Sequence, residues 1–144
     1  MTDTTNDDKP VLELSILPMR LAIAKRKPDA TIPAWALGSP FFSITRTDEE
    51  LSVVCEEEKI PKDQNPDKGW RCLKVHGPMP LDAVGILASL STVLAAAEIS
   101  VFAIASYDTD YILVKAEKLE QAIQALDGSG FVIHTHDDEA PDEA

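Results

Sequence analysis

The order of the segments that begin at Trp70 constrains the fold more than any other feature of the sequence. Strand-like apolar runs lie at 70–76, 101–106, 111–115 and 131–134. Between them, helical spacing of apolar residues occurs at 81–98 and 117–127. The order is therefore β-α-β-β-α-β, which is typical of the ferredoxin-like arrangement in the α+β class.

The segment 81–98 is the longest predicted helix. It contains no proline, and its apolar residues recur at the spacing of one helical face: Val84, Leu87, Leu90 (or Ser91) and Leu94. Pro80 suits the start of this helix, because the N–H that proline lacks would have no helical partner there. We therefore expect a helix from Leu81 to Glu98, with Gly85 inside its early turns.

The first half of the chain predicts fewer regular elements. Strands are expected at 11–16, 20–26, 41–45 and 51–56, and the last two of these read as a hairpin. Proline and glycine residues mark two loops, 28–40 with one short turn around Trp35, and 58–69.

Residues 41–57 resemble residues 101–117 when the sequence is shifted by 60 positions. The identical pairs are Phe42 and Phe102, Ile44 and Ile104, Asp48 and Asp108, Val54 and Val114, and Glu57 and Glu117. We interpret the chain as two related half-domains that pack as one fused sheet. The first, at 10–69, is degenerate, lacks the long helix and borrows the strand 70–76, whereas the second occupies 70–134.

Acidic residues dominate the charge of the chain. It has 25 Asp and Glu against 13 Lys and Arg, for a net charge of −12. Residues 1–9 and the acidic residues 135–144 are predicted to be disordered tails. Nucleic acids and anionic membranes bind basic surfaces, so neither is an expected partner. With neither a membrane-spanning run nor a signal-peptide pattern, the sequence predicts a cytoplasmic protein.

Catalytic and cofactor motifs are absent from the sequence. It has no glycine-rich phosphate loop and no nucleophile elbow, so no enzyme activity and no cofactor are expected. Cys55 and Cys72 each lie in an apolar run and are expected to be buried thiols. The pair His134 and His136 has metal-like spacing, but a zinc site needs a third or fourth ligand. The sequence offers no obvious one, and we predict no metal.

One basic cluster interrupts the acidic background. Arg20 and the run 25–27 place four bases within eight residues. Such a cluster either decorates a strand edge or faces an anion, and the sequence leaves both interpretations open.

Two polar turns together form a candidate binding site. The turn 77–80 leads from a strand into the long helix, where free N–H groups and the helix dipole suit a small carboxylate. Asp110 closes the polar hairpin connection 106–110, and its carboxylate at the sheet margin suits an ammonium group. A zwitterionic amino acid needs both groups. The alternative is a simple hairpin turn, in which Ser and Asp are favoured anyway.

The segment 70–134 resembles an ACT domain. The residues that carry the resemblance are 82–91, DAVGILASLS, and 101–114, VFAIASYDTDYILV. More narrowly, the chain is similar to small bacterial two-ACT-like proteins related to the CASTOR arginine sensors of eukaryotes. ACT domains bind amino acids or other small metabolites at domain interfaces, usually to regulate another activity.

The resemblance implies a set of ligand contacts. They come from the strand-to-helix turn and early helix, at Pro80, Leu81, Asp82, Val84, Gly85 and Ile86, and from the hairpin, at Ser106, Tyr107 and Asp110. Asp110 is the counterpart of the residue that contacts the ligand amine.

The resemblance also implies how such a protein acts. The chain lacks the second pair of ACT domains of the arginine sensors, so a homodimer is expected to supply the partner surface, and any regulated target is another chain. The expected function is a non-enzymatic amino-acid-binding regulator. The alternatives are a structural adaptor that keeps the fold without a pocket, and an enzyme that uses Asp110 or His76.

Overall fold

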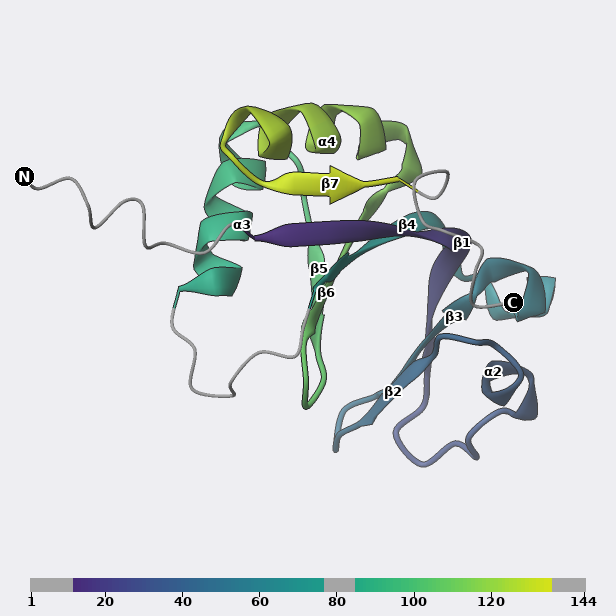
Figure 1. The fold of residues 1–144 in the computed structure, drawn as a ribbon. Helices are drawn as coiled ribbons and strands as arrows, with labels where there is room; N and C mark the ends of the chain where they lie inside the picture. Colours follow the sequence, from purple (N-terminus) through teal and green to yellow (C-terminus); the bar gives the residue numbers. More distant parts are fainter. Residues whose placement is uncertain (1–11, 77–84, 136–144) are drawn as a thin grey trace, which may run out of the picture.

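A single long strand, β1 (Glu13–Arg26), runs through the middle of the sheet in the computed structural model, which describes residues 12–76 and 85–135. Antiparallel β4 (Asp67–Val75) lies along one side of β1, and antiparallel β3 (Leu51–Glu56) pairs with the C-terminal half of its other side. The strand order is β2-β3-β1-β4-β6-β5, with β7 also beside β1 (Figure 1). The two halves therefore share one fused sheet, as predicted.

The first half has the strand order of a ferredoxin-like unit but little of its helical layer. Its strands lie in the order β4-β1-β3-β2, with β2 at Ser43–Arg46. The helix α2 (Ala34–Leu37) has only four residues. Two short 3-10 helices, Glu57–Lys59 and Lys62–Gln64, stand between β3 and β4, where the second helix would be. The first half thus has β4 as its last strand and lacks most of a helical layer.

The second half has the predicted β-α-β-β-α-β order. After β4 come five elements: α3 (Ile86–Ala96), β5 (Phe102–Ala105), β6 (Asp110–Lys115), α4 (Leu119–Gly128) and β7 (Val132–His134). A 3-10 turn at Ala116–Lys118 precedes α4. The last strand, β7, pairs in parallel with the N-terminal part of β1 instead of with β4. Because β1 already occupies that side of β4, β7 is displaced outward by one strand.

The segments 11–16 and 20–26, predicted as two strands, form one bent strand. The register of β1 against β4 shifts between Ile16 and Arg20, and Pro18 lies within that shift. Proline has no N–H to give to a ladder, so it is found at edges and bulges. The Arg71 Nη2 group donates a hydrogen bond of 3.0 Å to the Leu17 carbonyl beside the bulge. A bulge therefore bends the strand where the sequence suggested a break (Figure 1).

The start of the long helix was predicted wrongly at one described position. Gly85 has φ 85°, a left-handed conformation that cannot belong to a right-handed helix, and it is the residue before α3. Residues 81–84 lie outside the described residues. Of the predicted apolar face, Leu90 and Leu94 are buried, but Leu87 is 39% exposed and does not face the core.

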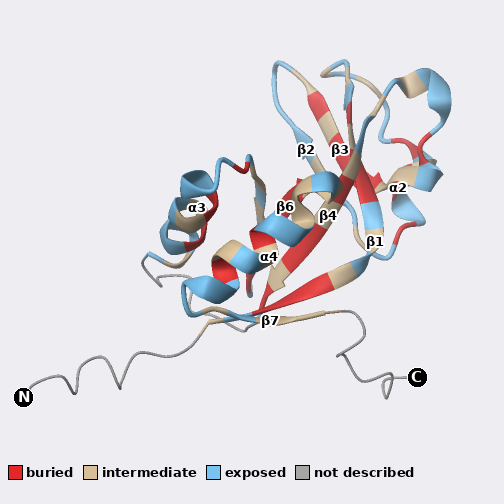
Figure 2. Ribbon diagram, turned by 90° about the horizontal axis from the view of Figure 1, so that it is seen from above, coloured by how far each residue is buried: buried red, intermediate tan, exposed pale blue. Residues whose placement is uncertain are grey.

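The core forms three clusters. The largest lies between α3, α4 and the sheet, where Leu14 and Ile16 of β1 join Leu90, Leu94 and Leu126. A second lies under α2, and a third, around Trp70, fills the opposite face of the sheet. Figure 2 shows the buried residues concentrated on the strands and on the helix sides that face them. Since Leu14 and Ile16 belong to the first half of the sequence, the second half does not bury its core alone.

Cys55 and Cys72 are buried free thiols, as predicted. Burial raises the pKa of Cys55 to about 11 and that of Cys72 to about 12. Both therefore stay protonated at neutral pH, in a form that is a poor nucleophile and a poor metal ligand. Among the described residues, no helix is long and apolar enough to cross a membrane.

Candidate functional site

The connection between β5 and β6 is a tight polar turn. The Ser106 N–H donates to the Thr109 carbonyl over 2.8 Å, and the Ser106 Oγ group donates to the same oxygen over 3.0 Å. Asp110 follows as the first residue of β6, paired with Ala105 and half-buried. The sequence predicted this hairpin and the position of its acid at the sheet margin, and both are confirmed.

Thr109 fixes this turn against the end of β4. It is 4% exposed, and its Oγ1 group donates a hydrogen bond to the Val75 carbonyl. The hairpin turn therefore lies beside Val75, the last residue of β4, at one end of the sheet.

The predicted residues of the strand-to-helix turn are described only in part. Pro80, Leu81, Asp82 and Val84 lie outside the described residues. Gly85 and Ile86 stand at the start of α3. Within the part of the chain that the structure describes, a Cβ atom added to Gly85 would meet no heavy atom within 4 Å.

Tyr107, one of the predicted contacts, is largely exposed. Its exposed fraction is 78%. A tyrosine with this much free surface presents both an apolar ring and a hydroxyl, a combination that is enriched at interfaces between proteins.

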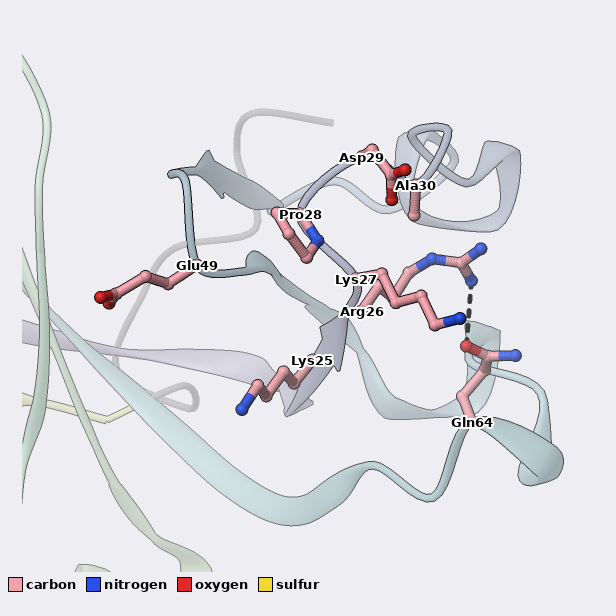
Figure 3. Close-up of a pocket in the computed structure, with 8 residues that line it drawn as sticks. All are labelled: Lys25, Arg26, Lys27, Pro28, Asp29, Ala30, Glu49 and Gln64. Carbon is pink, nitrogen blue, oxygen red and sulfur yellow. Dashed lines mark hydrogen bonds between the residues drawn. The ribbon is translucent and has the colours of Figure 1, made fainter.

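The first half has a corresponding place, and a cavity of about 580 Å³ opens there. It is lined by residues 25–30, at the end of β1 and the loop that leads to α2, together with Glu49 of the β2–β3 turn and Gln64 (Figure 3). A strand end and a hairpin turn thus meet in both halves. Arg46 of β2 holds the loop in place, since its guanidinium donates to the carbonyls of Pro28 and Ala30.

The walls of this cavity carry more positive than negative charge. The lining includes three bases, Lys25, Arg26 and Lys27, and two acids, Asp29 and Glu49. Arg26 donates to Gln64 Oε1 over 2.9 Å, as Figure 3 shows. Its Nε atom is buried and has no hydrogen-bond partner among the residues the structure describes. Such a set of groups suits a ligand that carries a carboxylate or another anion.

The sequence left two interpretations of the basic cluster open, a strand edge and a surface that faces an anion. Lys25 and Arg26 pair with β3 on one side, whereas the register between β1 and β4 ends at Ile23. Within the described residues, the run 25–27 therefore stands at a locally free edge of β1 and also lines the cavity. Arg20 lies elsewhere on β1 and pairs with Glu57 over 3.3 Å. The sequence does not reveal this cavity, because its walls come from segments that meet only once β1 takes its place in the middle of the sheet. A signal was present in the parallel between Lys27-Pro28 and Gly77-Pro78, each of which follows a strand.

Comparison with known families and proteins identifies the class. The profile of the ACT domain matches residues 65–127, and a profile that describes an N-terminal domain matches residues 20–63. A crystallised protein of Agobacterium tumefaciens is 38% identical, with a TM-score of 0.83 over 89% of this chain and 96% of that one. The chain belongs to the ACT-domain family.

More distant relatives agree with this assignment. The human protein named Cytosolic arginine sensor for mTORC1 subunit 1 is 30% identical over 94 residues, which are 60% of this chain and 29% of that protein. The chain thus spans less than a third of this curated relative. The regulatory subunit of aspartate kinase from Thermus flavus shares the fold. It is 12% identical, with a TM-score of 0.60 over 84% of this chain and 99% of that one.

Proposed function

We propose that this chain is a non-enzymatic regulator that binds an amino acid between the β4–α3 connection and the β5–β6 turn. The observation that carries the proposal is the bond from Thr109 to the Val75 carbonyl, since it holds the hairpin with Asp110 against the end of β4. Two comparisons support it, the match to the ACT domain and the likeness to a protein named as an arginine sensor.

Each end of the amino acid has a partner in this proposal. The Asp110 carboxylate accepts hydrogen bonds from the ligand ammonium group, a charge-assisted interaction of the stronger kind. The ligand carboxylate contacts the residues that the resemblance implies, Pro80, Leu81, Asp82 and Val84, together with Gly85 and Ile86 at the start of α3. At Gly85, a Cβ atom would meet no heavy atom of the described residues within 4 Å, which supports the close approach of a ligand there.

A second chain completes the site in the proposed active form. Tyr107 is largely exposed, and β5 is an edge strand whose outer N–H and C=O groups are available for pairing. Both features favour a homodimer with the ligand near its interface. An amino acid that binds the dimer more tightly than the monomer shifts the monomer–dimer equilibrium by its difference in affinity for the two forms. In the same way it can shift the equilibrium between the free chain and its complex with a target protein in the cytoplasm.

Asp110→Asn should weaken amino-acid binding by roughly 10- to 100-fold, because a hydrogen bond to a charged group contributes about 1.5–3 kcal/mol. The matched control is Asp108→Asn. It removes the same charge from the exposed part of the same turn, and should change affinity by less than about fivefold. Isothermal titration calorimetry, with the amino acid that most stabilises the protein, measures the affinity of both variants.

The two variants separate the proposal from its alternative. If Asp110→Asn binds as tightly as the original protein, the site is wrong. If the original protein binds no amino acid but binds a partner protein, the chain is an adaptor with an ACT fold.

A further inference from the structure

Three strands bring together two histidines and a glutamate at the same end of the sheet. Glu13 begins β1, His76 follows β4, and His134 ends β7. The parallel register places Glu13 opposite Val132 and Ser15 opposite His134, and the His76 N–H donates to the Glu13 carbonyl over 2.8 Å. One possible ligand atom from each of the three side chains lies within 4.8 Å of the other two.

One oxygen of the glutamate lies close to a nitrogen of each imidazole ring. His134 Nε2 is 2.8 Å from Glu13 Oε1, and His76 Nδ1 is 3.6 Å from the same oxygen. The rings stack with centroids 5.1 Å apart and an interplanar angle of 12°. The two nitrogens and the carboxylate oxygen therefore already lie close enough together to share one ion.

Ser15 holds the other nitrogen of His76. The distance from its Oγ atom to His76 Nε2 is 2.5 Å, and Ser15 itself is buried. An imidazole that donates its Nε2–H to this hydroxyl presents a lone pair at Nδ1, toward Glu13. Histidines that bind metals are usually held in this way, by a hydrogen bond from the nitrogen that does not touch the metal.

We propose that Glu13, His76 and His134 form a binding site for a divalent transition metal, with Zn²⁺ as the representative ion. The ligand atoms are Glu13 Oε1, His76 Nδ1 and His134 Nε2, and Ser15 is a positioning residue. Two imidazoles and one carboxylate are a set that zinc accepts, with its fourth position open to water or another ligand. The side chains are 34–47% exposed, so an ion can enter from solvent.

The sequence does not reveal this site because its ligands are far apart in the chain. His134 and His136 are two residues apart, whereas Glu13 is 121 positions from His134. Only the insertion of β1 between β4 and β7 brings the three side chains together. His136 lies outside the described residues and is not part of the proposed ligand set.

The site is tested by titrating Zn²⁺ into the full chain, free of any affinity tag and stripped with EDTA. We expect saturable binding of one ion per chain and an increase in Tm that EDTA reverses. Mg²⁺ prefers oxygen ligands and should change neither signal. The buried thiols should remain uninvolved, so a cobalt-loaded sample should show no sulfur-to-metal charge-transfer band.

Single substitutions identify the ligands. His76→Gln and His134→Gln should each abolish saturable binding, whereas His136→Gln, the matched control, should leave it unchanged. Ser15→Ala should weaken zinc binding about 10-fold, as is usual when the partner of a metal-bound histidine is lost. Circular dichroism checks that each variant is folded.

Three results would overturn the proposal: no saturable binding by the original protein, loss of binding in His136→Gln with retention in His76→Gln, or a cobalt–thiolate band. With only three histidines in the chain, the imidazole nitrogens can also be followed by NMR. Zinc should shift Nδ1 of His76 and Nε2 of His134. All these measurements omit amino acids, so their outcome is independent of the proposed function.

Discussion

A fragment of residues 65–144 should fail to fold, although it contains the whole stretch that matches the ACT domain. It lacks β1, which contributes Leu14 and Ile16 to the largest core cluster and is the strand with which β7 pairs. Burial of each of these side chains contributes about 1.5–3 kcal/mol. Together with the lost strand pairing, the loss in free energy of unfolding is comparable with the 5–15 kcal/mol that stabilises a typical domain.

Circular dichroism and thermal denaturation of the purified fragment measure this directly. The control is the full chain cut once in the exposed loop near Pro61, between β3 and β4. There the two pieces should stay associated and retain a cooperative transition, because every strand is still present. Cooperative unfolding of the isolated fragment would show that the second half, predicted at 70–134, is an independent domain.

Leu14→Ala should lower the free energy of unfolding of the whole chain by about 2–5 kcal/mol. Leu14 is fully buried and packs in the cluster beneath α3 and α4, although it belongs to the first strand. Its truncation leaves a cavity in the second half and loosens the element that both halves share. For a chain of this size, the loss corresponds to a fall in Tm of roughly 5–20 °C.

The matched control is Leu37→Ala, at the end of α2. Leu37 is 53% exposed, so its truncation should change stability by less than about 0.5 kcal/mol. Chemical denaturation of both variants, followed by fluorescence of the tryptophans, gives the two values. Equal effects of the two substitutions would contradict the core described above. A biphasic transition in Leu14→Ala would contradict a single shared unit.

Local sequence patterns predicted the elements that depend on neighbouring residues. Both hairpins, the short turn at Trp35 and the helix after Lys118 were expected, because alternation, helical spacing and turn residues act over a few positions. The start of α3 was missed at Gly85. A glycine tolerates both helical and left-handed conformations, so the sequence does not reveal which one it adopts.

Long-range pairing was harder to predict. The sequence predicted two strands, 11–16 and 20–26, whereas a bulge at Pro18 lets β1 bend and continue. The insertion of β1 between β4 and β7 follows from how two incomplete halves share strands, and no short stretch of sequence encodes it. The same insertion decides that the basic run 25–27 ends a central strand and that His76 meets His134.

In the candidate site, too, local features were predicted from the sequence and long-range contacts were not. Asp110 and its hairpin were found from the sequence, because a polar turn between apolar strands is a local feature. The bond from Thr109 to Val75 was not predicted, since it joins segments 34 positions apart. The cavity beside Lys25 and Glu49 also depends on the meeting of distant segments.

The most direct test of an amino-acid-binding regulator is a thermal-shift screen of the purified full chain against the twenty amino acids. A ligand at 100 times its dissociation constant stabilises a protein by about 2.7 kcal/mol, which for this size raises Tm by roughly 5–10 °C. We predict that one amino acid, or a few related ones, produces such a shift. No shift with any amino acid at millimolar concentration would contradict the proposed function.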